Sequence, residues 1–164
     1  MPVVSNTSPI LSLAAIQQLT LLKRQFGEIL IPSAVLSELK TSSDFRGTKQ
    51  IRQALRSGWI RKVEIQNLHL AQALALELDR GEAEAITLAL QLNLREILMD
   101  EHDGRTRAKA MGLRPVGVLG VLLRAKREGN IPSVKSAMLL LRQEVGFFIE
   151  DSLFQSILME AGEK

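Results

Sequence analysis

Amide and carboxylate side chains recur in this sequence directly after segments that have the composition of buried strands. Asn6 stands where a segment beginning with Val3 and Val4 ends, and Asp100 and Glu101 follow the apolar run 97–99. Oxygen-bearing side chains of this kind bind hard divalent cations or move protons. Which of these they do depends on how the rest of the chain brings them together.

Short apolar segments alternate with helical segments along the whole sequence. Strand character is found at 3–4, 28–31, 59–65, 96–100 and 114–116. Helical spacing of apolar residues is found at 9–24 (two short helices), from 33, and at 45–57, 69–79, 82–92, 104–111, 117–128, 132–143 and 151–161, with a loop and N-cap at 41–44. This alternation predicts a parallel sheet covered by helices on both faces. No linker-like composition interrupts it, so we expect a single domain over residues 1–164.

The polar residues that follow these strands are predicted to meet at one edge of the sheet. Parallel strands joined by right-handed crossovers place all their carboxyl ends on the same side. The first strand then brings Asn6, Thr7 and Ser8 there, and the fourth brings Asp100, Glu101 and Asp103. Nearby helices can add Glu38 and either Glu82 or Glu84. We expect a cluster of acids with no basic residue among them.

A cluster of this kind has a defined chemistry. Carboxylates packed together repel one another unless a cation neutralises them. Mg²⁺ and Mn²⁺ prefer oxygen ligands, and one or two such ions can activate water for the displacement of a phosphodiester. The sequence therefore favours a metal site that acts on nucleic acid.

Basic residues gather in a different part of the sequence. Helical spacing puts four of them on one face of a predicted helix, and a fifth follows the acidic strand end: Arg46, Lys49, Arg52, Arg56 and Arg105. No aromatic residue is interleaved with them, which favours contacts with the nucleic-acid backbone over base stacking.

Each of these signals also has a simpler explanation. Asn6 can hydrogen-bond within its own turn. Glu38, Glu82 and Glu84 can be solvated helix residues. One acid of the segment 100–103 can cap the following helix. The basic run from 40 to 62 can be an ordinary solvated surface.

Composition limits the remaining classes of protein. The chain has 164 residues, of which 46% are hydrophobic, and a formal net charge of +3. It contains no cysteine, which excludes disulfides and thiolate metal sites. Its first residues lack the pattern of a signal peptide, and no apolar run reaches the length of a membrane span. We therefore expect a cytoplasmic protein without membrane contact.

Five segments in the same order together resemble the PIN-domain superfamily. They are Val3 to Ile10, Ile31-Pro32-x-x-Val35-x-x-Glu38, Gly81 to Ile86, Leu98 to Glu101, and Gly117 to Leu123. Within that superfamily the chain is most similar to a prokaryotic branch related to VapC-type toxins. The resemblance covers nearly the whole chain.

The resemblance implies a three-layer α/β/α sandwich with about five parallel strands and an Mg²⁺- or Mn²⁺-dependent endoribonuclease. Its four acid positions fall on Asn6, Glu38, Glu84, and either Asp100 or Glu101. Thr7, Ser8, Glu82 and Asp103 are then expected beside the metal ligands. Related toxins commonly form homodimers and are silenced by a small antitoxin, so both partners are expected besides RNA.

The sequence departs from the family pattern at its first acid position. Asn6 offers one neutral carbonyl oxygen where an aspartate would offer a charge, so metal affinity should be lower. This leaves a second hypothesis, a catalytically weak protein that binds RNA or a partner. A phospho-acceptor receiver domain also has acids at strand ends, but it requires a late lysine that is missing at Gly117.

Overall fold

The computed structural model of the protein describes residues 1–41 and 46–164. These residues form a parallel five-stranded sheet in the order β3-β2-β1-β4-β5. The strands are β1 (Val3–Ser5), β2 (Ile29–Ile31), β3 (Ile60–Lys62), β4 (Glu96–Leu98) and β5 (Arg114–Val116). The predicted α/β class and parallel sheet are confirmed, with the first strand at the centre of the sheet.

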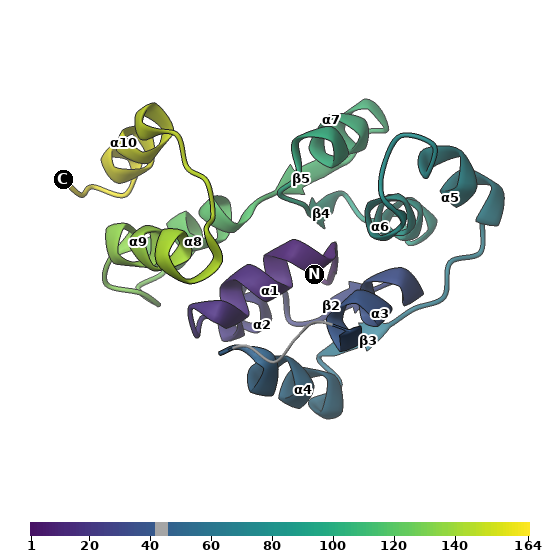
Figure 1. The fold of residues 1–164 in the computed structure, drawn as a ribbon, viewed down its shortest axis with the longest axis horizontal. Coiled ribbons are helices and arrows are strands. Elements are labelled where there is room, and N and C mark those ends of the chain that lie inside the picture. Colours follow the sequence, from purple (N-terminus) through teal and green to yellow (C-terminus); the bar gives the residue numbers. More distant parts are fainter. Residues whose placement is uncertain (42–45) are drawn as a thin grey trace.

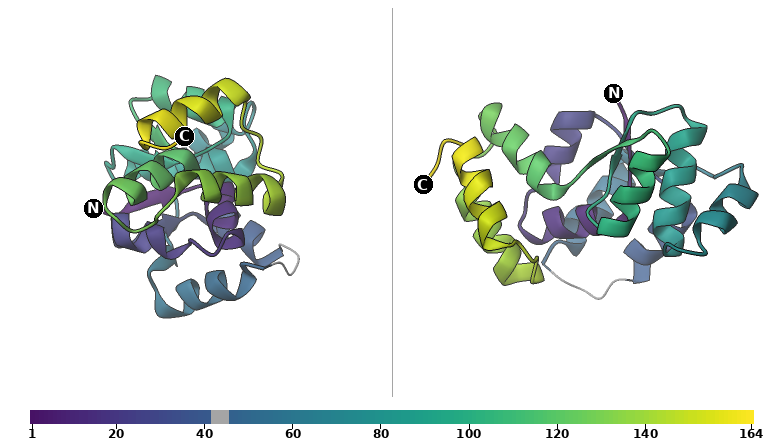
Figure 2. Two further views of the ribbon diagram at one scale, coloured as in Figure 1. Left: turned by 90° about the vertical axis from the view of Figure 1, so that its left-hand side faces the viewer. Right: turned by 90° about the horizontal axis from the view of Figure 1, so that it is seen from above.

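Within the described residues, ten helices connect and cover these strands (Figure 1). They are α1 (Thr7–Ala15), α2 (Thr20–Phe26), α3 (Ser33–Thr41), α4 (Thr48–Ser57), α5 (Leu68–Leu74), α6 (Arg80–Gln91), α7 (His102–Ala110), α8 (Val118–Arg127), α9 (Val134–Val145) and α10 (Asp151–Glu160). The helices α8, α9 and α10 gather at one side of the molecule and α5, α6 and α7 at the other (Figures 1 and 2).

Successive residues of each central strand enter different hydrophobic clusters. Val3 of β1 and Leu98 of β4 pack with apolar residues of α1, α8 and α9. Their neighbours Val4 and Ile97 pack with α6 and the adjoining helices instead. Because side chains alternate across a strand, the two clusters lie on opposite faces of the sheet. The prediction that helices cover both faces is therefore confirmed.

Element ends differ from the predictions in a few places. The break near residue 17 is confirmed, and Gln17 adopts a positive φ of 61° there. The helix predicted over 69–79 ends at Leu74, and the one predicted over 45–57 begins at Thr48, which leaves Arg46 in the preceding turn. The strand predicted over 59–65 is only Ile60–Lys62. Of the loop and N-cap predicted at 41–44, Thr41 is instead the last residue of α3, and residues 42–44 lie outside the described residues.

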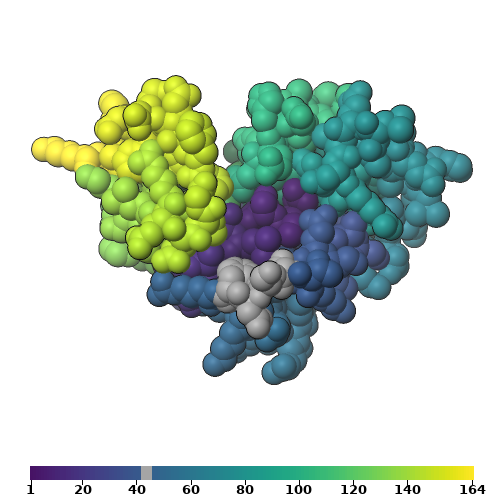
Figure 3. Space-filling view, viewed as in Figure 1, coloured from purple at the N-terminus to yellow at the C-terminus, as the bar shows by residue number. Residues whose placement is uncertain are grey.

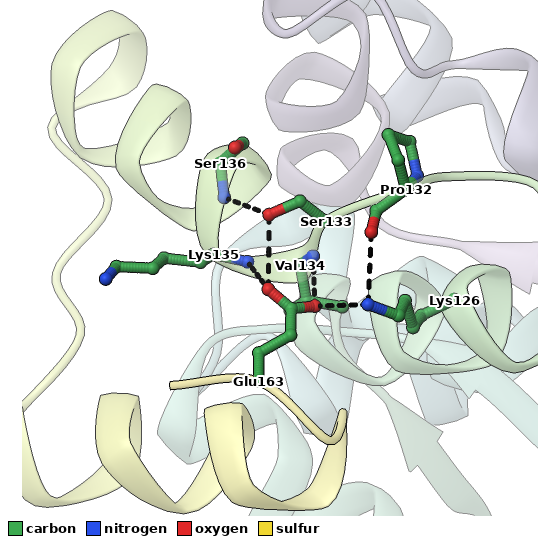
Figure 4. A network of polar contacts seen from close by, with 7 residues as sticks. All are labelled: Lys126, Pro132, Ser133, Val134, Lys135, Ser136 and Glu163. Carbon is green, nitrogen blue, oxygen red and sulfur yellow. Dashed lines mark hydrogen bonds and ion pairs between the residues drawn. The ribbon is translucent and has the colours of Figure 1, made fainter.

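One carboxylate links the residues after α10 to the start of α9, in addition to the apolar packing of α10. Glu163 accepts hydrogen bonds from the backbone N–H groups of Val134 (2.7 Å) and Lys135 (3.1 Å), at the start of α9. It also accepts from Ser133 Oγ (3.1 Å) and Lys126 Nζ (3.0 Å), as Figure 4 shows. Burial alone would raise its pKa, but these donors outweigh it and lower the pKa of Glu163 to about 2. Glu163 therefore joins the chain end to α8 and α9.

Replacing this carboxylate should destabilise the protein. Glu163→Gln loses the charge from a site built of donors, and charge-assisted hydrogen bonds contribute about 1.5–3 kcal/mol. We expect the melting temperature to fall by about 3–12 °C, measured by circular dichroism. Glu160→Gln, an exposed residue of α10, should leave it unchanged. Equal melting temperatures for the two variants would contradict the attachment.

Wild type and Glu163→Gln should also differ in how their melting temperatures depend on pH. Because the folded state holds the pKa of Glu163 near 2, below the ordinary value of about 4.3, the attachment is fully present above that ordinary value. It is lost as pH falls from there towards 2. Wild type should therefore lose more stability than Glu163→Gln between about pH 4.5 and 2.

Candidate metal and phosphate site

Asn6 lies at the carboxyl end of the central strand. Its backbone N–H donates to Leu98 O of β4 (3.0 Å), so the ends of β1 and β4 are held side by side. Its side chain is buried and makes no capping bond to α1. Asn6 Oδ1 has no hydrogen-bond partner among the described residues. A simpler explanation of Asn6 was a hydrogen bond of its side chain within its own turn. The side-chain oxygen does not form such a bond.

Glu38 of α3 approaches Asn6 over a glycine. Thr7 Oγ1, one residue after Asn6, donates to Glu38 Oε2 (2.5 Å). A Cβ placed on Gly81 would lie 2.8 Å from Glu38 Oε1 and 3.3 Å from Asn6 Oδ1. The two predicted ligand oxygens therefore face the same bare stretch of backbone at the start of α6. Ser8 Oγ is also buried without a recorded partner in the described part of the chain.

The start of α6 contributes a second acid through a capping box. Glu82 N–H donates to Asp79 Oδ1 (2.8 Å), and Asp79 N–H donates to Glu82 Oε1 (3.2 Å). Burial, with additions from the carboxyl of Asp79 and the charge of Glu101, raises the pKa of Glu82 to about 7. Glu82 Oε2 is buried and unpartnered within the described residues, close to the backbone of Gly104.

Glu84 is positioned differently from the other predicted ligands. Its Oε1 accepts from the N–H of Ala34 in the first turn of α3 (3.1 Å), and its Oε2 accepts from Arg80 Nε (2.9 Å). The side chain is 8% exposed, whereas that of Arg80 is 79% exposed. Glu84 therefore links α6 to α3, and its role as a metal ligand stays a prediction.

Asp100 is the half-buried acid at the end of β4. Its Oδ1 accepts from Val118 N–H at the start of α8 (3.0 Å), whereas Oδ2 is buried with no partner in the described residues. Burial raises the pKa of Asp100 to about 6, although the Val118 N–H and the Arg105 guanidinium lower it. A Cβ on Gly117 would lie 2.7 Å from Asp100 Oδ1 and 3.2 Å from Arg105 Nη1. Asp100 thus caps α8, not the helix that follows it directly.

The remaining predicted acids lie further out. Glu101 is exposed at the N-cap of α7, and its charge raises the pKa of both Glu82 and Asp100, so it lies near both. Asp103 is exposed in the first turn of α7 and lines a separate cavity with Glu77 and Arg107. The structure therefore brings Glu101 to the candidate site. For Asp103 it shows a place beside the separate cavity instead.

Two arginines lie among the acids, which corrects the expectation that no basic residue would do so. Arg80 pairs with Glu84, and Arg105 lies beside Asp100 while donating to Met99 O (2.9 Å). The spacing of Arg80 and Glu84, four residues apart on a helix, was the available signal for the first pair. Arg105 meets Asp100 only through the turn into α7, so spacing alone gives no comparable signal.

The donor chemistry of this edge fits a hard divalent cation. The unpartnered oxygens of Asn6, Glu82 and Asp100 are amide and carboxylate donors, which Mg²⁺ and Mn²⁺ prefer. Within residues 1–41 and 46–164, however, no three acidic or histidine side chains form a ready-made ligand group. Proteins often hold Mg²⁺ through one or two carboxylates and several waters. The side chains at this edge therefore fit a weakly held, hydrated ion.

The surface around these residues is hollowed. Figure 3 shows a depression between the body formed by α8–α10 and the body formed by α6 and α7, with α1 in purple at its floor. Thr7–Ala15 form α1, so the helix that directly follows Asn6 lies at this floor.

The predicted basic row begins at the opposite end of α1 from Asn6. Lys49, Arg52 and Arg56 are exposed on α4, and Arg46 pairs with Glu144 of α9 (3.5 Å). A Cβ on Gly47 would touch Ala14 at the far end of α1, about 12 Å from Asn6 by the rise of a helix. Of the five predicted RNA-binding residues, only Arg105 lies at the acids. The other four remain a prediction for a longer RNA.

Several residues of the site carry no functional signal of their own. Asp79 was recognisable only as part of the capping sequence Asp-x-x-Glu. The glycines 81, 104 and 117 each lie so close to a predicted acid that a Cβ there would displace its carboxylate. Their importance lies in the missing Cβ, which sequence spacing does not reveal.

Comparison with known proteins gives one match. The family model DUF3368, described as a PIN domain, matches residues 2–163. Neither the curated proteins nor the solved structures contain a match.

Proposed function

The chain belongs to the PIN-domain family, a nuclease fold, and from this premise we propose that it is a metal-dependent endoribonuclease that cleaves RNA phosphodiester bonds. The observation that carries the proposal is the set of buried oxygens without hydrogen-bond partners at one edge of the sheet, on Asn6, Glu82 and Asp100. Buried polar atoms are almost always satisfied by protein groups, ordered water or a bound ligand, so these three atoms favour water or a cation at this edge.

The ligand with the right chemistry is Mg²⁺ or Mn²⁺. Asn6, Glu38 and Asp100 would hold it, with Glu84 and Glu101 as the further candidates. When bound, such an ion activates water and stabilises charge on the phosphoryl oxygens.

The other residues of the site have separate tasks. Thr7 fixes the orientation of Glu38 through its hydrogen bond. Arg105, held by Met99 O, presents a cation beside Asp100 where a phosphate of the RNA would lie. Glu82 has a pKa near neutrality, so it can hold or release a proton at Oε2.

Partners follow from the family alone. We propose that RNA is the substrate, that a small antitoxin protein silences the enzyme, and that two copies associate, as in related toxin–antitoxin pairs. No helix in the described part of the chain is both long and apolar enough to cross a bilayer.

The proposed activity should depend strictly on added metal. Purified protein, stripped with a chelator, is incubated with a 5′-labelled single-stranded RNA and with a hairpin RNA while Mn²⁺ and Mg²⁺ are titrated separately. We expect internal cleavage with either ion and none with the chelator, resolved on a denaturing gel. Cleavage without metal, or no cleavage at any metal concentration, would contradict the proposal.

A second function is favoured by one observation, the neutral amide at Asn6. A site with one charge fewer binds metal more weakly, and such a protein could act by binding RNA or a partner. In that case RNA binding should fall with salt and persist when Glu38 and Asp100 are neutralised together, with no cleavage by either protein.

A further inference from the structure

A second cavity opens directly beside the candidate site. Its volume is about 500 Å³, within the range of sites that bind small organic groups. One wall is β5 and the other is the segment after α9 with the first turns of α10. The residues that matter here are Arg114, Pro115, Val116, Phe147, Phe148 and Leu153.

This cavity shares residues with the site of the predicted acids. Asp100 and Arg105 line it as well, and Gly117 forms part of its wall. A group seated in the cavity would therefore lie next to a phosphate placed at Asp100. The proposed function does not use this space, because cleavage requires only the phosphate.

The strand that forms one wall is unsuited to pairing with another strand. β5 is an edge strand bonded to β4 through Arg114 N–H to Arg95 O (2.7 Å) and through Met99 N–H to Val116 O (3.0 Å). In a parallel pair the residue between these positions directs its backbone away from the partner strand. That residue is Pro115, which has no N–H to donate. A peptide added as a strand would find no donor there.

The opposite wall presents an aromatic ring to solvent. Phe148 is 86% exposed, whereas its neighbour Phe147 packs against the hydrophobic core. An exposed ring at the mouth of a cavity is a platform on which a flat group can stack. Nucleobases stack on such rings regardless of sequence, because every base has a π-face.

The charges around the cavity suit a polyanion. Arg114 is 81% exposed and lies 3.9 Å from its one recorded ion-pair partner, Glu96. Arg105 is fixed in place by its bond to Met99 O (2.9 Å). Both guanidinium groups can contact phosphates on either side of a base in the cavity.

We propose that this cavity binds one unpaired nucleobase of the RNA, stacked on Phe148, next to the phosphate at the acids. The inference rests on the proposed function in taking RNA as the substrate. It adds that the base beside the cleaved bond must be unstacked, so the protein selects single-stranded positions over duplex.

The test measures binding in a chelator, where no cleavage occurs. The probes are a single-stranded RNA carrying 2-aminopurine at one position and the same RNA with an abasic site there. Phe148→Ala should bind the first about tenfold more weakly than wild type, by fluorescence anisotropy. The quenching of 2-aminopurine on binding should also be lost. Phe148→Tyr should restore both, and Leu76→Ala, an equally exposed residue on the opposite side of the fold, should behave as wild type.

The abasic RNA separates stacking from a general loss of binding. Wild type and Phe148→Ala should bind it with equal affinity. The inference is overturned if Phe148→Ala binds the 2-aminopurine RNA as wild type does, or if it loses the same affinity for both RNAs. Absence of any RNA binding by wild type would overturn both this inference and the nuclease proposal.

The two proposals can also fail separately. Metal-dependent cleavage by wild type with no effect of Phe148 on binding would leave the nuclease and reject the base pocket. A Phe148-dependent affinity for unpaired bases without cleavage at any metal concentration would leave the pocket and reject the nuclease.

Discussion

Asn6→Asp is expected to tighten the binding of Mn²⁺ at least tenfold, about 1.4 kcal/mol, and to raise the rate of RNA cleavage. Asn6 Oδ1 is buried, unpartnered in the described residues, and faces the same backbone as Glu38 Oε1. The substitution keeps the shape of the side chain and adds a negative charge at this point. A charged oxygen holds a divalent cation more strongly than a neutral amide oxygen does.

Stability gives an independent measure of the same change. Without metal, the new carboxylate lies close to Glu38, and the repulsion between them should lower the melting temperature. With saturating Mn²⁺ the order should reverse, because a ligand that binds only the folded state stabilises it according to its affinity. Calorimetric titration and thermal melts with and without Mn²⁺ check both parts.

Asn67→Asp is the matched control. Asn67 is also an N-cap residue, at α5, but its side chain accepts from Leu70 N–H (3.0 Å) and lies outside the candidate site. An aspartate there can make the same bond, so neither Mn²⁺ affinity nor cleavage should change. If Asn6→Asp behaves like this control, Asn6 does not occupy a ligand position.

Glu38→Gln should reduce cleavage by about 100-fold, or about 2.7 kcal/mol of transition-state stabilisation, with little loss of stability. The amide can still accept the hydrogen bond from Thr7, so α3 keeps its place. What the substitution removes is the charge that would hold the cation. Single-turnover cleavage at fixed Mn²⁺, with thermal melts alongside, measures both effects.

Glu84→Gln separates ligation from anchoring. It weakens the pair with Arg80 while leaving an oxygen to accept from Ala34 N–H, so the melting temperature should fall. Cleavage should be lost in this variant as well if Glu84 is a ligand. Unchanged cleavage in Glu84→Gln with loss in Glu38→Gln would make Glu84 an anchor of α3 only. Unchanged cleavage in both would remove this edge of the sheet as the active site.

The sheet was predictable because its strands are marked by patterns within short stretches of sequence. Runs of buried β-branched residues, such as Val3-Val4, separated by helical spacing, indicate doubly covered strands. Element ends were less predictable. The residues from 75 to 79 continue an apolar pattern, yet the chain turns there before the capping box of α6 starts at Asp79.

The candidate site was predictable as a set of strand ends but not as a set of contacts. That Asn6, Glu38 and Asp100 lie at one edge follows from parallel topology. That Glu84 is bonded to Ala34, or that Asp100 caps α8, depends on how separate helices pack, which spacing along the chain does not encode. The hydrogen bonds of Glu163 to the start of α9 likewise depend on the packing of separate helices and could not be predicted from spacing.

The parallel sheet also determines the electric field at this edge. Four helices, α1, α3, α7 and α8, begin within four residues of a strand end, and α6 begins beside Asn6 and Glu38. Each helix start carries about half an elementary positive charge from its macrodipole. Five such charges, with the guanidinium groups of Arg80 and Arg105, offset much of the negative charge on Glu38, Glu82, Glu84, Asp100 and Glu101. A polyanion approaching the edge therefore meets far less repulsion than a count of its carboxylates suggests.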